Sequence, residues 1–179
     1  MGNPGIRSFA LPCMAALLCL WGTQARATPD NGFGFYLGGL SSRDSTLYGN
    51  SNGGFVQADV QFMVNEHWSL NPYLLLGSES TDQSFDIETG EGGLQARYWM
   101  GSGSTFLAGQ FFFHDSLLKQ GSTVSSSLYG PGIGLAAGWE SDSHWSVSLA
   151  ANVYRMWSAY GRPATTRSEA LLLIGYHWY

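Results

Sequence analysis

Residues 55–64 read Phe-Val-Gln-Ala-Asp-Val-Gln-Phe-Met-Val, and apolar and polar side chains alternate along almost the whole stretch. Successive side chains of a β-strand point to opposite faces, so Val56, Val60 and Phe62 share one face while Gln57 and Asp59 share the other. A strand with lipid on its outer side and a polar interior has this pattern. The stretch therefore predicts one strand of a transmembrane β-barrel.

Further segments of the chain complete a ring of such strands. The segment 94–100 alternates in the same way and places Arg97 on the inward face, where it could pair with Asp59. Most segments are near the roughly 9 to 11 residues that a tilted strand needs to cross a bilayer. The fold class we predict is an all-β, eight-stranded antiparallel transmembrane β-barrel of the outer membrane. Its strands are expected at 33–40, 55–64, 68–77, 94–100, 105–114, 129–139, 145–153 and 169–179.

The last segment, 169–179, is ambiguous in phase because both of its faces are rich in apolar residues. One face carries Leu172, Ile174, Tyr176 and Trp178. We expect the other face to contact lipid: Leu171, Leu173, Gly175, His177 and Tyr179. The chain ends in an aromatic residue, which resembles the terminal signal of outer-membrane barrels.

The connections between the expected strands alternate in length, as barrels of this class require. Short ones at 65–67, 101–104 and 141–144 belong to the periplasmic end, and longer ones at 41–52, 78–90, 115–126 and 158–167 belong to the outside. Five tryptophans fall near the short connections or the carboxyl end, and we interpret them as one interfacial girdle. They are Trp68, Trp99, Trp139, Trp145 and Trp178.

The amino-terminal residues predict export. Arg7 is followed by an apolar stretch at 9–21 and by Ala25-Arg26-Ala27, a small-x-small cleavage pattern. We expect a signal peptide at 1–27 and a single barrel domain at 28–179. Both cysteines fall inside the signal peptide, so the mature chain has no thiol, and we expect neither a metal nor a cofactor.

The charge balance disfavours nucleic acid as a partner. Without Arg7 and Arg26 the chain keeps six lysines and arginines against thirteen aspartates and glutamates. We expect a monomer in the outer membrane, with lipid A and phospholipid as its partners.

The strongest candidate for chemistry is the sequence His114-Asp115-Ser116, at the outer end of the fifth expected strand. Residues two apart share a face, so His114 and Ser116 can both point inward while Asp115 turns away. A serine beside an imidazole is the minimum for activating a hydroxyl toward an ester. Histidine and serine are also ordinary residues at such a junction, so the cluster alone is a weak signal.

The inward face of the sixth expected strand lacks large side chains. Its residues, Gly130, Gly132, Gly134, Ala136 and Gly138, suggest a pocket for an acyl chain, or else they only relieve crowding in a narrow barrel.

Prolines in two strands, Pro72 and Pro131, cannot donate to the ladder. They either open the wall to a lipid or mark bulges.

Charged residues near the outer ends suit a lipid headgroup. The arginines could bind lipid phosphates, and the acidic segment could meet them through divalent cations, although solvated side chains are the commoner outcome. The arginines are Arg43, Arg155, Arg162 and Arg167, and the acids are Glu79, Asp82, Asp86, Glu88 and Glu91.

The segment Phe113-His114-Asp115-Ser116, with the later Gly138-Trp139-Glu140, resembles the lipid A palmitoyltransferases (PagP). The resemblance implies an eight-stranded barrel that holds a palmitoyl chain, and an Asp-Ser pair that works with a histidine from an early outer loop. Here the pair follows the fifth strand, and the first long connection has no histidine, so His114 would replace it.

The spacing His114-x-Ser116 is also similar to that of the lipid A 3-O-deacylases (PagL). The acidic partner that this family has in the next strand is missing, and Glu169 is the nearest inward candidate.

The leading hypothesis is a lipid A acyltransferase that moves an acyl chain from a phospholipid to lipid A, with His114, Asp115 and Ser116 at its site. One alternative is a non-enzymatic barrel like the OmpA transmembrane domain or OmpX, with a structural or adhesive role, and the other is a lipid A deacylase. The non-enzymatic alternative predicts an interior filled by a charged network around Asp59, Arg97 and Glu169.

Overall fold

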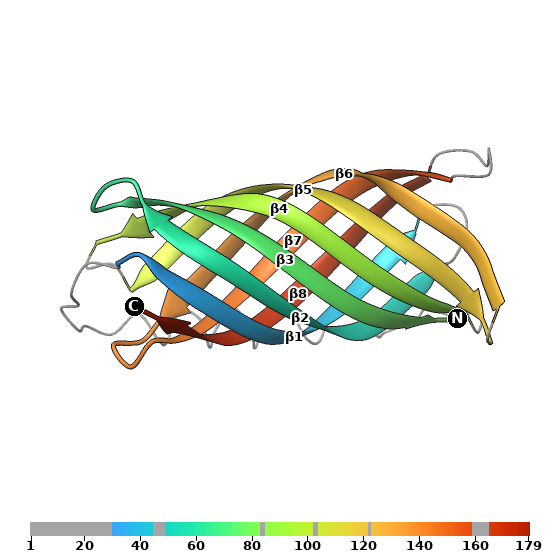
Figure 1. Cartoon of the computed structure of the whole chain (residues 1–179), viewed down its shortest axis with the longest axis horizontal. Coiled ribbons are helices and arrows are strands. Elements are labelled where there is room, and N and C mark those ends of the chain that lie inside the picture. Colours follow the sequence, from blue (N-terminus) through green and yellow to red (C-terminus); the bar gives the residue numbers. More distant parts are fainter. Residues whose placement is uncertain (1–29, 45–48, 83–84, 102–103, 122, 159–164) are drawn as a thin grey trace, which may run out of the picture.

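The structure is a computed structural model that describes residues 30–44, 49–82, 85–101, 104–121, 123–158 and 165–179. These residues form a closed antiparallel barrel in which each strand pairs with the next and β8 pairs with β1 (Figure 1). The described chain contains no helix that could cross a membrane. The strands are β1 (Gly32–Asp44), β2 (Asn50–Met63), β3 (Trp68–Thr81), β4 (Asp86–Met100), β5 (Thr105–Gln120), β6 (Thr123–Glu140), β7 (Trp145–Ser158) and β8 (Thr165–Trp178).

The eight-stranded fold confirms the prediction, and the strands differ from it mainly at one end. At the short-turn end, on the left in Figure 1, most strands begin or end within a residue or two of the expected positions. At the opposite end, which we call the outer end, the expected long connections are mostly strand. For example, β5 continues to Gln120 and β6 already begins at Thr123. The outward residues of these extensions are mostly polar, and apolar residues such as Ile87, Leu118 and Leu128 are buried inside, so a pattern with the apolar face outward did not reveal them.

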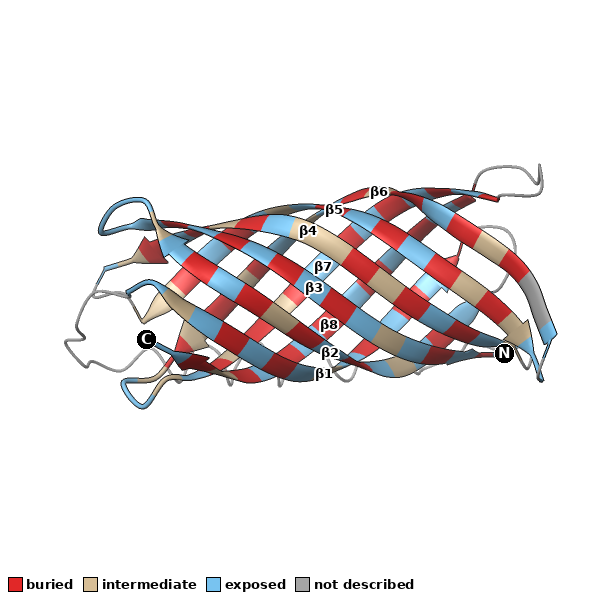
Figure 2. Ribbon diagram, viewed as in Figure 1, coloured by how far each residue is buried: buried red, intermediate tan, exposed pale blue. Residues whose placement is uncertain are grey.

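Burial alternates along every strand, as the checkered ribbon of Figure 2 shows. The predicted inward residues of β2, Gln57 and Asp59, are buried, whereas the outward-facing Leu74 and Leu135 are 69% and 73% exposed. A closed barrel that exposes a continuous apolar band is built to sit in lipid, because no backbone edge is left unpaired there. The barrel therefore spans a membrane.

The expected phase of the last strand is wrong. In β8, Leu171, Leu173 and His177 are buried in the interior, whereas Leu172 and Ile174 face outward. The polar residues of β8 explain why this face points inward. Residues 167, 169 and 177 are an arginine, a glutamate and a histidine and share one parity, so the opposite phase would have placed all three against lipid.

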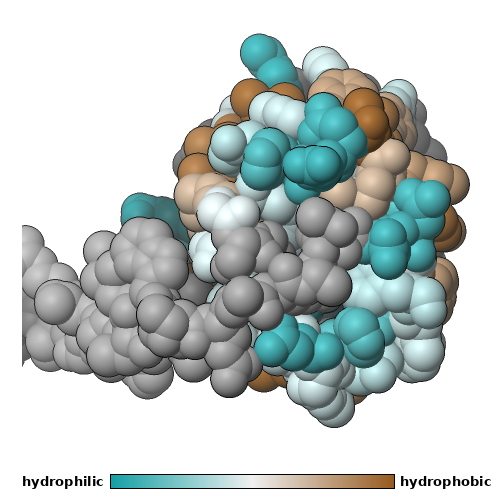
Figure 3. All heavy atoms as spheres, turned by 90° about the vertical axis from the view of Figure 1, so that its left-hand side faces the viewer, coloured by the Kyte–Doolittle hydropathy of each residue, from teal (hydrophilic) through white to brown (hydrophobic). Residues whose placement is uncertain are grey.

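The expected tryptophan girdle needs a correction as well. Trp68, Trp145 and Trp178 are exposed near the short-turn end, but Trp99 is fully buried, and its indole N–H donates to the Ser69 hydroxyl at 3.2 Å. Trp99 lies two residues after Arg97 on the same strand, so its side chain points inward as that of Arg97 does. Trp157 is exposed near the outer end of β7, so tryptophans occur at both ends. Seen end-on, the short-turn face carries hydrophilic residues, with hydrophobic ones along its edge (Figure 3).

Each strand proline lies at a gap in one ladder. Pairing between β2 and β3 runs to Asp59↔Tyr73 and resumes at Phe62↔Leu70, a gap that includes Pro72. Pairing between β6 and β7 is interrupted in the same way around Pro131. Both prolines still face a partner in the other neighbouring strand. Whether either gap admits a lipid stays a prediction.

Candidate functional site: a polar plug in the barrel

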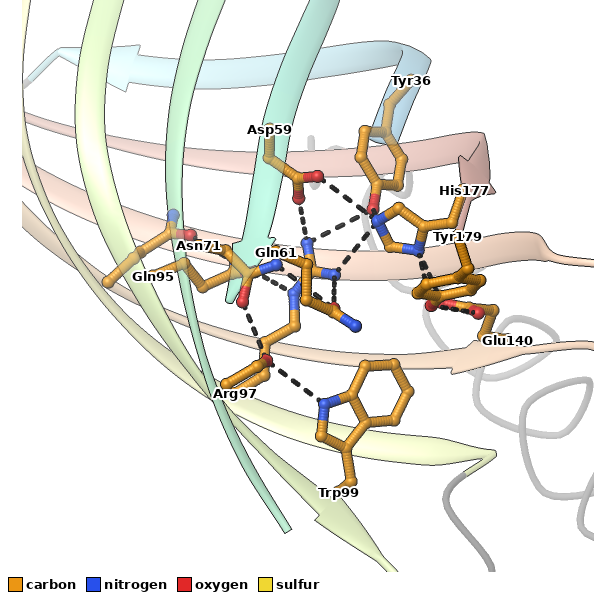
Figure 4. Close-up of polar contacts among 12 residues, drawn as sticks. Tyr36, Asp59, Gln61, Asn71, Gln95, Arg97, Trp99, Glu140, His177 and Tyr179 are labelled. Carbon is orange, nitrogen blue, oxygen red and sulfur yellow. Dashed lines mark hydrogen bonds and ion pairs between the residues drawn. The ribbon is translucent and has the colours of Figure 1, made fainter. Parts of the chain in front are cut away.

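The short-turn half of the interior is organised around Arg97 of β4 (Figure 4). Its guanidinium donates to Asp59 of β2 and to Gln95, both at 2.5 Å, and to the Tyr36 hydroxyl at 3.3 Å. The Phe106 ring lies 4.9 Å from the guanidinium carbon. The pairing of Arg97 with Asp59 confirms the prediction from alternation. An ion pair removed from water needs such additional hydrogen bonds to offset its desolvation.

His177 of β8 extends this network toward the carboxyl end of the chain. Its Nε2 lies 2.6 Å from the Tyr36 hydroxyl and 3.3 Å from Asp59, and its Nδ1 lies 2.6 Å from Glu140 of β6. Tyr179 donates to the same Glu140 carboxylate at 2.7 Å. Polar side chains from five strands thus meet in one buried cluster, and the exposed terminal tyrosine contacts it at the end of the barrel.

A second branch runs from Arg97 along the wall between β2 and β3. The Gln61 carbonyl lies 3.4 Å from Arg97 and accepts from the Asn71 amide at 3.3 Å. Asn71 in turn accepts from Ser69 at 2.8 Å, which reaches the indole of Trp99. We call these residues together the Arg97 network. Its members other than Tyr179 are buried, so the short-turn half of the barrel is closed by side chains.

The outer end has its own buried ion pair, between Arg167 of β8 and Glu79 of β3. Arg167 also donates to the hydroxyls of Ser42 and Ser51. Both serines donate to Glu79, at 2.8 and 2.7 Å, and Thr89 donates to it at 3.2 Å. We call this the Arg167 network. Sequence reasoning placed Glu79 and Arg167 in outer loops, so this pair was missed.

Between the two networks lies the predicted His114 and Ser116 pair. Both side chains are buried in the interior, and the His114 Nε2 is 2.6 Å from the Ser116 hydroxyl. The His114 Nδ1 faces Glu91 of β4 at 3.4 Å, and Tyr73 donates to the same carboxylate at 2.6 Å. The ring of Tyr154 stacks on the imidazole, with centroids 4.2 Å apart.

The structure separates Asp115 from the other two residues, because it lies on the exposed outer face of β5. The acidic partner of His114 is Glu91, directly opposite it in the β4–β5 register. Alternation could have found Glu91, since it has the same parity as Gln95 and Arg97. Sequence reasoning counted it instead among the acids of an outer segment.

Glu169 makes its hydrogen bonds to other groups than the imidazole of His114. It accepts from the Asn152 amide at 2.8 Å and from the Tyr154 hydroxyl at 3.2 Å. Asn152 in turn accepts from Gln110 at 2.5 Å, and Gln110 accepts from Gln95 at 2.9 Å. Because Gln95 also contacts Arg97, the central polar groups connect to the Arg97 network.

The glycine-rich face of β6 points inward as expected, but neighbouring side chains fill the space before it. A Cβ added at Gly138 would run into the Phe106 ring, and one at Gly132 would run into the Phe112 ring. Gly134 faces Asn152 and Gln110 in the same way. The central cavity near Ala136 measures about 10 Å³, which is close to the room for one water. An acyl chain would need these rings to move.

The central groups share the hydrogen-bond pattern of an activated nucleophile, with a serine, a base and an orienting carboxylate. Ser116 is only 1% exposed, however, and Tyr154 covers the imidazole. The same contacts also satisfy every member of the group as a buried polar cluster. Within the described residues, the arrangement fills the barrel.

Comparisons with known proteins support the fold only. No family model matches the sequence, and no curated protein matches it. The structure of Ail, the attachment invasion locus protein of Yersinia pestis, matches with a TM-score of 0.60 and 10% identity over 84% of this chain and all of Ail. The structure of Ail with the heparin analogue sucrose octasulfate gives 0.57 and 12% over the same shares.

Neisserial surface protein A (NspA) matches with a TM-score of 0.58 and 12% identity, over 80% of this chain and 96% of NspA. At these identities the likeness is one of fold, that of small outer-membrane barrels. It does not support the resemblance to lipid A palmitoyltransferases.

Proposed function

We propose that this protein is a non-enzymatic outer-membrane barrel with a sealed interior, and that its role is structural or adhesive. The observation that carries the proposal is the filled interior. Buried ion pairs at Asp59 and Glu79 and the polar cluster at Glu169 occupy its length and leave a central cavity of about 10 Å³. A barrel filled in this way acts through the surface that it presents.

The outer end is the surface available for such a role. The strands continue there beyond the apolar band, and they carry exposed charges that include Arg43, Asp86 and Glu88. The structural neighbours are by name an attachment protein, also crystallised with a heparin analogue, and a surface protein. An adhesive role for this chain is a proposal by analogy with those names.

The proposal is tested by comparing cells that lack the gene with cells that carry the wild type or Ser116→Ala. We expect the acyl pattern of lipid A, measured by mass spectrometry, to be the same in all three. We also expect both alleles to restore detergent resistance and surface attachment equally. Purified protein in planar bilayers should show no stable conductance. A wild-type-specific change in lipid A acylation would refute the non-enzymatic role.

The second candidate is the acyltransferase, which the contacts among Glu91, His114 and Ser116 favour. In that reaction His114 would accept the Ser116 proton as the serine oxygen attacks the phospholipid ester, and it would give that proton to the departing lysophospholipid. A lipid A hydroxyl would then attack the acyl-serine, and His114 would pass the proton of that hydroxyl back to Ser116. This candidate requires the Phe112 and Tyr154 rings to open a path. It predicts that Ser116→Ala and Glu91→Gln both abolish the lipid A change, whereas Asp115→Asn does not.

A further inference from the structure

A shallow hollow lies in the outward face of β7, β8 and β1, on the outer-end side of the apolar band. It measures about 450 Å³ and is lined by residues that include Gly39, Ser41 and Ala170. Ala151, Ala170 and Ser41 are register partners across the three strands, so one row of the wall has only small side chains. A Cβ added at Gly39 would meet a single backbone oxygen, at 3.9 Å, which shows that the surface there is open.

A second hollow lies beside it, on the outward face of β1, β2 and β3. Gly39 pairs with Gly54 of β2, and the second hollow, of about 490 Å³, is bordered by Leu37, Val56 and Leu76. Both lie among the apolar side chains that face the membrane. Together they suit the acyl chains of a lipid that has more than two of them.

Beyond the row of Ala151, Ala170 and Ser41, toward the outer end, the exposed side chains include arginines and hydroxyl groups. In the next row Val153, Ser168 and Arg43 are register partners, and Arg155 and Thr166 follow in the row after that. The two arginines stand two strand spacings and two residues apart, roughly 12 Å between Cα atoms. Ser168 and Thr166, both exposed, lie between them. Groups in this arrangement can bind phosphate oxygens with guanidinium and hydroxyl donors.

Arg43 and Arg155 differ from the other cations in having no carboxylate partner among the described residues, which leaves them available for a phosphate. Of the five lysines and arginines that the structure describes, Arg97, Arg167 and Lys119 each have a carboxylate partner. Arg43 and Arg155 are exposed, and no carboxylate among the described residues pairs with them. The exposed acids described at the outer end lie elsewhere, at Asp82 after β3, at Asp86 and Glu88 of β4 and at Asp115 of β5. Among the described residues of the outer end, the two arginines without a carboxylate partner therefore lie on a different face of the barrel from the exposed acids.

We infer that the β7–β8–β1 face binds a phosphorylated, multiply acylated lipid of the lipid A type, with its phosphates on Arg43 and Arg155 and an acyl chain in the hollow at Ala170. The inference adds a lipid-binding surface to the proposed outer-membrane barrel, and it rests on that proposed function. The occupant follows from the charge of the two arginines, from the apolar lining below them and from the two adjoining hollows.

The test uses the full-length protein purified from membranes and native mass spectrometry in detergent. The probes are bisphosphorylated lipid A, the same lipid without phosphates, and phosphatidylglycerol. We expect one lipid A molecule to stay bound to the wild type. The double substitution Arg43→Gln/Arg155→Gln should weaken binding at least about tenfold, since it removes several charge-assisted hydrogen bonds. Ala170→Phe fills the hollow and should weaken binding by a similar factor.

Matched controls keep the test sharp. Lys119→Gln removes a cation from another face, and Ala96→Phe adds a ring to the outward side of β4, so both should bind as the wild type does. Heat-modifiable migration on gels checks that each variant folds. Binding within twofold of wild type by the double arginine variant or by Ala170→Phe overturns the inference. Equal binding of phosphatidylglycerol or of dephosphorylated lipid overturns it too. An altered lipid A acyl pattern would instead count only against the proposed function.

Discussion

The two buried arginines of the barrel each form an ion pair in the interior, but the groups around the two pairs differ. Arg97 is surrounded by amides and aromatic rings, and its carboxylate partner Asp59 is shared with His177. Arg167 sits among small hydroxyl groups, and its partner Glu79 accepts from Ser42 and Ser51 as well. Glu79 thus has donors besides its arginine that can turn toward it, whereas Asp59 depends chiefly on Arg97. We therefore expect the free energy of unfolding to depend more strongly on Arg97, in the short-turn half, than on Arg167, at the outer end.

The largest effect should follow Arg97→Met. The change leaves Asp59 buried without its cation, which costs about 3 to 5 kcal/mol in proteins where such pairs have been broken. We expect a loss of that size in the free energy of unfolding, measured by urea titration of the protein in lipid vesicles. Adding Asp59→Asn should recover a large part of it. A double variant as unstable as the single one would show that the ion pair is not the cause.

Arg167→Met should cost less, nearer about 2 to 3 kcal/mol, because hydroxyl donors remain on Glu79. The same titration measures it, with Glu79→Gln/Arg167→Met as the matched double variant. If Arg167→Met proved more harmful than Arg97→Met, the ranking of the two networks would be reversed.

Two of the inward glycines of β6 make room for phenylalanine rings of β5. Gly138 faces Phe106 beside Arg97, and Gly132 faces Phe112 beside the central cluster. We expect Gly138→Ala and Gly132→Ala each to cost about 1 to 3 kcal/mol through overcrowding. Shortening the facing ring, with Phe106→Leu or Phe112→Leu, should recover part of the loss. The outward Gly109, which has open space around it, is the control, and Gly109→Ala should leave unfolding nearly unchanged.

The smallest effect should come from the exposed pair of Lys119 and Glu88. Their side chains are 30% and 51% exposed, and exposed pairs are worth at most about 1 kcal/mol. Lys119→Gln should therefore shift the urea midpoint only slightly, and less still in high salt. A shift as large as that of Arg167→Met would contradict the distinction between buried and exposed pairs.

Alternation was a sufficient guide where the outward face was clearly apolar. It predicted the inward direction of Gln57, Asp59 and Arg97, and from these the contact between Arg97 and Asp59. It failed in β8, where both faces hold leucines, although Arg167, Glu169 and His177 share the correct parity. It also failed in the outer extensions, where serines, threonines and glycines give no hydrophobic period, so Glu79 and Glu91 were assigned to a loop.

The amino-acid sequence by itself determined the wall of this barrel. The period of two fixes which side chains face lipid, and turn residues fix where most strands end at the short-turn side. Apart from the pair of Arg97 and Asp59, only the tertiary structure decided which inward groups meet, because closure places β8 beside β1 and the strand register selects each partner. It also decided that the glycine-rich strand is no pocket as it stands. The rings that fill it come from β5, and no local pattern in β6 reveals them.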